Sequence, residues 1–402
     1  MPNEPVKANA NSDAANDKSF SLVLGGPLYQ LYLRSRLARP PLNLVHRRVI
    51  GFSLICWLPC LILALVEGHA YAGVSVPFLQ DIGVHIRFLC ALPLLIGAEL
   101  IVHGRIRDIV QQFLDRGLIA PQDRARFDKI IASAMGLRNS ILIELCLLTI
   151  AVGVGHWVVS GYLNLNGDAW NAVNHSGALH FTIAGYWYAF VSLPILRFII
   201  LRWYFRLFIW YWFLWHVRQL RLRLNLFHPD LCGGLGFLAE SVLAFAPVLM
   251  AQTILLAGVI VQQIWFTGAT LPHFKMEILG VVVFLILLVL APLCFFMVQL
   301  GHARLEAKRE YGILASHYVD DFRHKWIEHF GTEKEQLLGT GDIQSLADLG
   351  NAYGVVREMR IVPFGKDVVV SVVIIIVIPL LPLTLTMFPF EKIIEQLFKL
   401  VL

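Results

Sequence analysis

Five ionisable residues lie in long apolar runs of this chain or at their edges. They are Glu99, His103, Glu144, Arg197 and Arg202. Ionisable groups inside a membrane are rare, and they usually pair with one another or line a polar pathway. We therefore expect a charged layer shared by three helices. One interpretation is an ion- or proton-handling site in which Glu99 titrates and Arg202 keeps Glu144 ionised, and the other is a static ion-pair network.

Residues 228–237, with the sequence HPDLCGGLGF, form a second candidate site. Pro229 fixes a turn, the glycines let the backbone approach closely, and an apolar run begins directly afterwards. Backbone N–H groups at the start of a helix can bind an anion such as phosphate. The segment is either a plain turn or a site for a lipid headgroup or small anion, where its histidine and aspartate could do acid–base chemistry. The candidate residues are His228, Asp230, Gly233, Gly234 and Gly236.

Three histidines near one polar loop are metal-ligand candidates by residue type. His156, His175 and His180 flank a segment that has no Lys or Arg, and imidazole groups bind zinc or copper. Their spacing matches no metal-binding pattern, and no two cysteines have CxxC spacing. The sequence therefore predicts no metal site and no cofactor.

Composition and charge indicate the medium that surrounds these residues. Hydrophobic residues make up 57% of the chain and charged residues 15%, which is low beside the roughly 25% of a soluble domain. Seven Lys and Arg precede residue 49, seven lie in 104–139 and nine in 301–366, whereas 67–83 and 161–177 have none. Positive loops stay on the cytoplasmic side during insertion. The net charge of +5 is divided among separate loops, which favours anionic lipid headgroups over nucleic acid as a partner.

These patterns predict an all-α fold, a polytopic transmembrane helix bundle of about seven spans with the N-terminus inside and a small cytoplasmic helical domain. The bundle is expected to occupy residues 27–300, and one last span follows the cytoplasmic domain. The expected spans are 49–66, 84–103, 140–160, 179–200, 240–266, 278–299 and 367–388.

The segments outside the spans have predicted structures of their own. We expect a disordered tail at 1–26, a cytoplasmic helical hairpin at 104–139 and an amphipathic C-terminal helix at 391–402. Residues 201–224 hold an aromatic stretch between arginines, which indicates a helix lying in the inner membrane interface. The alternative, a second crossing at 198–216, would bury two arginines at a high cost in free energy.

Residues 301–366 are predicted to form the cytoplasmic helical domain. Apolar residues recur there among charged ones, which is typical of an amphipathic element packed under the bundle, and a docking surface for a protein partner is the alternative. Asp342 is expected to cap a helix in this domain. The basic residues beside the last span, which we expect to face anionic lipid, are Arg357, Arg360 and Lys366.

Three functions fit this sequence. The first is an inner-membrane transporter or channel for an ion or small solute, linked to protons through the charged layer. The alternative is a non-transporting sensor, scaffold or subunit of an envelope complex that acts through residues 301–366. The third is a lipid-active membrane enzyme that uses His228 and Asp230. In each case the charge distribution predicts a multi-pass protein of a bacterial-type inner membrane, with its N-terminus cytoplasmic and its C-terminus periplasmic.

Overall fold

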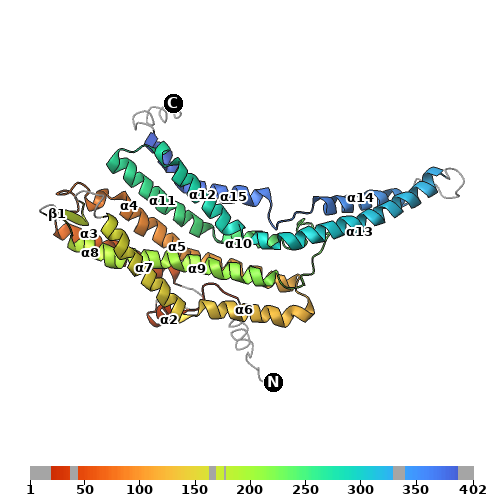
Figure 1. The fold of residues 1–402 in the computed structure, drawn as a ribbon, viewed down its shortest axis with the longest axis horizontal. Coiled ribbons are helices and arrows are strands. Elements are labelled where there is room, and N and C mark those ends of the chain that lie inside the picture. Colours follow the sequence, from red (N-terminus) through yellow and green to blue (C-terminus); the bar gives the residue numbers. More distant parts are fainter. Residues whose placement is uncertain (1–19, 37–43, 163–168, 176–177, 329–339, 388–402) are drawn as a thin grey trace, which may run out of the picture.

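The described part of the protein is a bundle of long helices (Figure 1). Within it the one sheet is a two-stranded antiparallel hairpin. This bears out the expected all-α helix bundle. The computed structural model describes residues 20–36, 44–162, 169–175, 178–328 and 340–387.

Six helices of the described chain are long and apolar enough to cross a membrane. The number rises to seven if the bent pair Pro121–Arg138 and Ile141–Gly153 is one span. The six are Val45–Val66, Ile82–Asp115, Ile183–Val217, Ala246–Thr267, Leu271–Leu290 and Lys366–Met387.

Two of these helices are much longer than a single span. The first has 34 residues and joins α4 (Ile82–His85), a π-helical turn and α5 (Leu92–Asp115). The second has 35 residues and joins α8 (Ile183–Trp187), another π-helical turn and α9 (Leu193–Val217). Helices of this length measure about 50 Å, whereas the hydrocarbon core of a bilayer is about 30 Å thick. About 20 Å of each helix therefore extends beyond the span length.

α9 continues without a break through residue 200, where the sequence predicts that the fourth span ends. Neither a separate interfacial helix at 201–224 nor a second crossing at 198–216 is present among the described residues. The aromatic stretch is misleading because one face of it packs against protein. Trp203, Trp210 and Phe213 recur at helical spacing on that face and are buried.

The extended ends of the long helices enclose an aromatic core. Phe113 of α5 contacts the rings of Phe127 in α6 (Arg124–Arg138), Phe213 in α9 and Phe237 in the following loop. Residues 104–139, where a helical hairpin is expected, hold the end of α5, which runs on to Asp115 as one helix with the preceding span, and α6.

The segment before α2 (Pro27–Arg34) is packed into the bundle, although residues 1–26 are expected to be a disordered tail. The ring centroid of Phe20 lies 4.7 Å from that of Phe213 and 6.3 Å from that of Trp210. Leu22 is 1% exposed. The expectation is wrong for residues 20–26 because their apolar side chains complete the aromatic core, and residues 1–19 lie outside the described chain. We call residues 20–28 the N-terminal strap.

A pair of antiparallel helices extends from the bundle as an arm (Figure 1). Its first helix, α13 (Met297–Arg323), follows α12 (Lys275–Leu290) after a short turn, and its second is α14 (Asp342–Glu358). Asp342 does not cap α14, since Gly341 occupies the N-cap position. Its carboxylate instead accepts hydrogen bonds from Lys325 and from the indole of Trp326 (3.0 and 2.9 Å), which pins the two helices together near the tip.

The opposite end of the bundle carries the β-hairpin, so we name the two ends the arm end and the hairpin end. Strands β1 (Ala172–His175) and β2 (Ala178–Phe181) lead into α8. The last described helix, α15 (Lys366–Val377), continues as a 3-10 helix to Met387, and the amphipathic helix expected at 391–402 lies outside the described residues. The other helices that the following sections use are α3 (Val45–Val66), α7 (Ile141–Tyr162), α10 (Ala239–Ala244) and α11 (Ala246–Thr267).

The packing of the strap gives a first prediction. We expect Phe20→Ala to lower the free energy of unfolding by about 3–5 kcal/mol, the usual cost of truncating a buried Phe. The matched control is Leu31→Ala, because Leu31 is 57% exposed. Thermal unfolding of the detergent-purified protein measures both effects. Equal shifts of the two variants would contradict the observed packing of the strap.

Candidate functional site

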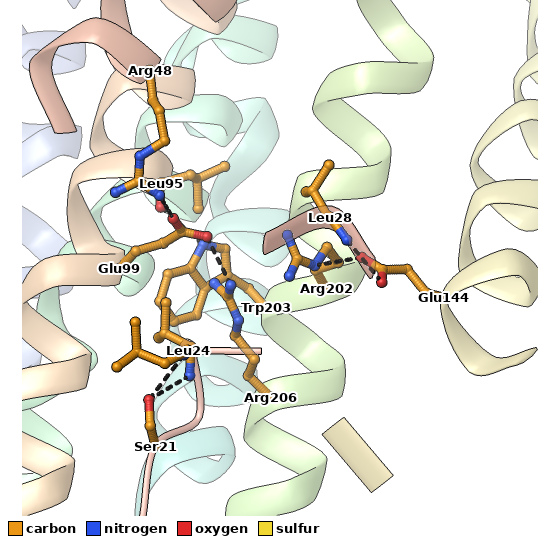
Figure 2. A network of polar contacts seen from close by, with 11 residues as sticks. Ser21, Leu24, Leu28, Arg48, Leu95, Glu99, Glu144, Arg202, Trp203 and Arg206 are labelled. Carbon is orange, nitrogen blue, oxygen red and sulfur yellow. Dashed lines mark hydrogen bonds and ion pairs between the residues drawn. The ribbon is translucent and has the colours of Figure 1, made fainter. Parts of the chain in front are cut away.

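The charged layer is centred on Glu99, which is 6% exposed in the middle of the bundle (Figure 2). Its Oε1 accepts a hydrogen bond from Nη2 of Arg206 at 2.7 Å, and its Oε2 pairs with Arg48. The three side chains belong to α5, α9 and α3. One carboxylate therefore joins three helices.

A second ion pair lies beside the first, between α7 and α9. Nε of Arg202 is 3.5 Å from Oε1 of Glu144, and the other carboxylate oxygen accepts the backbone N–H of Leu28 at 3.3 Å. The indole of Trp203 donates to the carbonyl of Leu95 at 3.0 Å, and its ring faces the guanidinium of Arg206 (Figure 2). The layer thus reaches from α3 across α5 and α9 to α7.

The N-terminal strap is bound to this layer by its backbone and by one hydroxyl. Oγ of Ser21 is 2.9 Å from Nδ1 of His103. The backbone carbonyl of Ser21 accepts a hydrogen bond from Arg138 at 2.6 Å. The backbone N–H of Gly26 donates to the side-chain oxygen of Asn139 at 3.0 Å. Three polar side chains near the layer are thereby occupied by the strap.

Helix boundaries place the layer near the first turn of two apolar helices. Arg48 is the fourth residue of α3 and Glu144 the fourth of α7, so both helices begin at this level. The two long helices pass through the level and continue toward the arm end. At such a boundary buried charges are less costly than at the centre of a membrane, because long side chains and water reach them more easily.

Sequence reasoning found some members of this layer and missed others. It named Glu99, Glu144 and Arg202, which the structure brings together with their ion-pair partners. His103 faces Ser21 instead of a carboxylate, and Arg197 lies on α9 five residues before Arg202. The two arginines that bind Glu99 were not proposed as site residues. One signal was available: Arg206 follows Arg202 by four residues and so shares its helical face.

A small cavity opens beside the second ion pair. Its volume is about 20 Å³, which is room for about one water molecule. The residues that line it come from the strap, the end of α6, the start of α7 and the middle of α9. They are Leu22, Arg138, Ser140, Glu144, Leu147, Arg202, Phe205, Arg206 and Ile209.

The glycine-rich loop at 228–237 binds a carboxylate of its own chain. Oδ1 of Asp230 accepts the N–H groups of Cys232 and Gly234 at 2.8 and 3.2 Å, and Oδ2 accepts that of Gly236 at 2.8 Å. Nδ1 of His228 lies 3.0 Å from the same carboxylate. The donors that were expected to hold a headgroup or anion are therefore occupied by Asp230, and the loop forms a closed turn.

The electrostatics of Asp230 follow from this arrangement. Partial burial alone would raise the pKa of its carboxyl, but the three backbone N–H groups and His228 together lower that pKa below its usual value. Burial and the nearby Asp230 raise the pKa of the Cys232 thiol to about 11, so this cysteine stays protonated at neutral pH.

The same loop joins the bundle to the base of the arm. The backbone N–H of Arg360, just after α14, donates to the carbonyl of Leu231 at 2.7 Å, and the ring of Phe227, the residue before the loop, lies 4.1 Å from that of Tyr311 in α13. Arg116, just after α5, donates to the carbonyl of Gly234 at 3.3 Å. Both helices of the arm and the end of α5 therefore meet on one loop.

The remaining candidates belong to the base of the arm, the start of α15, the β-hairpin and α7. Three expected lipid-facing basic residues, Arg357, Arg360 and Lys366, are exposed around the base of the arm and the start of α15. His175 and His180 belong to the β-hairpin, and the side chains of His156 and His175 lie outside what the structure describes. No group of three His, Cys, Asp or Glu among the described residues could hold a metal ion.

Comparison with family models, with curated proteins and with solved structures gave no match. The function is therefore inferred from the contacts inside the chain and from the surfaces that it exposes.

The central ion pairs give a second prediction. We expect Glu99→Gln to destabilise the protein by about 3–5 kcal/mol, because it leaves two buried guanidinium groups without their carboxylate. Glu144→Gln should cost less, about 1 kcal/mol, since its ion pair is longer and Glu144 is bound by one arginine instead of two. Thermal unfolding of the two variants side by side is the measurement. If Glu144→Gln were the more damaging of the two, Glu99 would not be the centre of the layer.

The loop gives a third prediction, which concerns pH. Because the pKa of Asp230 is lower in the folded protein than the 3.8 of a free aspartate, its stabilising effect is complete above about pH 4 and is lost as the pH falls through the folded pKa. We expect Asp230→Asn to lower the unfolding midpoint at pH 7 and to differ less from the wild type at about pH 3. A difference between the two proteins that does not change with pH would contradict this account.

Proposed function

We propose that the protein is a non-transporting, multi-pass inner-membrane protein that couples its membrane bundle to a cytoplasmic partner through the arm. In this proposal the arm end is cytoplasmic, since the segments rich in Lys and Arg gather there, and the hairpin end is periplasmic. The observation that carries the proposal is the shared anchorage of bundle and arm on the loop at 228–237.

The charged layer supports a coupling role over a conducting one. Both oxygens of Glu99 are occupied by arginines, and the cavity beside the layer has room for about one water molecule. A carboxylate held by two arginines keeps its charge and its position. It is suited to fixing the helices relative to one another, and it is poorly suited to exchanging a proton in each cycle.

The surface of the arm supports a protein partner. Large apolar side chains stand exposed on an element that extends away from the bundle, and such residues in water commonly mark an interaction surface. Acidic and basic residues alternate along α13 around these apolar side chains. The arm therefore has no continuous positive surface of the kind that binds nucleic acid. The exposed apolar residues are Leu305, Ile313, Leu314, Val319, Ile327 and Ile343.

The path from bundle to arm is short and continuous. α12 ends at Leu290, a single 3-10 turn follows at Leu293–Phe296, and α13 begins at Met297. The side chain of Gln299 donates to the carbonyl of Arg218 at the end of α9. A tilt of α9 or α12 would therefore move the arm, which is the mechanical requirement for a sensor or a scaffold whose state depends on the membrane.

Transport through the charged layer is the second candidate. The observation that favours it is the cavity between Glu144 and Arg202, which brings a small polar space into the bundle. Under this alternative the layer would open in another conformation, and the ion would pass Glu99.

The deciding experiment combines flux with site-specific cross-linking. A photoreactive side chain at Leu305 or Ile313 in the full-length protein should give a discrete adduct in native membranes, whereas one at Leu148 in α7 should not. Purified protein in proteoliposomes should pass no protons, cations or anions above the protein-free background. Flux that Glu99→Gln abolishes, without an adduct at the arm, would contradict coupling and support transport.

A further inference from the structure

The cavity beside the second ion pair has an excess of positive charge. Three arginines line it, Arg138, Arg202 and Arg206, and Glu144 is its one carboxylate, which leaves a net charge of +2 on the lining. The neighbouring pair of Arg48 and Glu99 adds no net charge. Arg206 also feels the repulsion of Arg202. Positive charge gathered in a poorly hydrated site is costly unless an anion is close.

Two buried guanidinium nitrogens next to this site, both of Arg48, have no acceptor in the described protein. The side chain of Arg206 is 5% exposed and lines the cavity, and its Nη2 donates to Glu99. Arg48, whose side chain is fully buried on the far side of Glu99, uses one nitrogen while its Nε and Nη2 have no partner. Arg48 does not line the cavity, so an anion bound there would be held by the three arginines that do.

We propose that Arg138, Arg202 and Arg206 form a binding site for a phosphate group. Guanidinium groups bind phosphate oxygens through paired, charge-assisted hydrogen bonds, and a cluster of three suits the tetrahedral group. The level of the site agrees with this assignment, since α3 and α7 both begin there, at the limit of the apolar slab where lipid phosphates lie. The phosphate comes either from an anionic lipid headgroup or from free inorganic phosphate.

The N-terminal strap covers this site. Leu22 lines the cavity, and the space of about 20 Å³ holds about one water molecule, which is too small for a phosphate group. Arg138 is meanwhile bound to the carbonyl of Ser21. Binding of phosphate therefore requires Leu22 to move away and Arg138 to exchange a backbone carbonyl for a charged oxygen, which is the stronger acceptor. The strap and the phosphate group therefore compete for the guanidinium group of Arg138.

The proposal goes beyond the coupling role of the arm and does not depend on it. The phosphate site involves the strap, α6, α7 and α9, whereas the arm is anchored on the loop at 228–237. The site could be present in a transporter as well as in a scaffold, so binding measurements on it are distinguishable from the cross-linking of the arm.

The test uses two variants that break the same ion pair but change the charge of the site in opposite directions. Arg202→Gln removes a positive charge, and Glu144→Gln removes the one negative charge. A unit charge several ångströms from a bound anion changes its affinity by about tenfold or more. We expect the Kd for phosphate to rise about tenfold in the first variant and to fall about tenfold in the second. A merely structural role of the pair would affect both variants alike.

Binding is measured as the rise in the unfolding midpoint of the full-length protein in nanodiscs. Inorganic phosphate is titrated in phosphatidylcholine nanodiscs, and phosphatidic acid is titrated into the same bilayer in a parallel series. Stabilisation by inorganic phosphate identifies free phosphate as the ligand, and stabilisation by phosphatidic acid alone identifies a lipid headgroup.

Leu22→Ala supplies an independent test that leaves every charge in place. Shortening the side chain at position 22 should increase several-fold the affinity for the probe that binds the wild type, because a smaller side chain must be displaced from the cavity. The proposal is overturned if neither probe stabilises the protein, or if Arg202→Gln and Glu144→Gln shift the Kd in the same direction.

Discussion

The burial of one carboxylate between two guanidinium groups is the constraint on which the rest of this structure depends. A charge removed from water must be paired, and Glu99 has partners on both of its oxygens, Arg48 on one and Arg206 on the other. Because these residues belong to α5, α3 and α9, their pairing fixes the three helices along their axes as well as side by side. A shift of any helix by one turn, about 5 Å, would leave a charge unpaired.

The architecture at the arm end follows from this fixed register. α5 and α9 are held together at the layer and continue past it, α5 for about four turns beyond Glu99 and α9 for about three turns beyond Arg206, which brings their aromatic side chains into contact. Phe113 and Phe213 then form a core that Phe20 of the strap completes. The loop at 228–237 lies against this core and carries the base of the arm, so the position of the arm is set, through a series of packed elements, by the layer in the membrane.

Much of this arrangement could be predicted from the sequence, and the remainder depended on contacts distant along the chain. Glu99, Glu144 and Arg202 are recognisable because a charge in an apolar run needs a partner. No local pattern shows that Arg48, 51 residues earlier, is that partner. The arginines that flank the aromatic stretch of α9 give the sequence pattern of an interfacial helix. Periodicity cannot distinguish a helix face covered by protein from one covered by lipid headgroups. The glycines of the loop reveal available N–H donors, but not that Asp230 already fills them.

A double-mutant cycle between Glu99 and Arg206 tests the central claim most directly. The free energy of unfolding would be measured in mixed detergent micelles for the wild type, Glu99→Gln, Arg206→Gln and the double variant. If their ion pair fixes the bundle, the double variant should be more stable than the sum of the single effects predicts, by at least about 1 kcal/mol. Effects of the two substitutions that simply add would mean that the residues are neighbours without being partners, and that another interaction holds the helices in register.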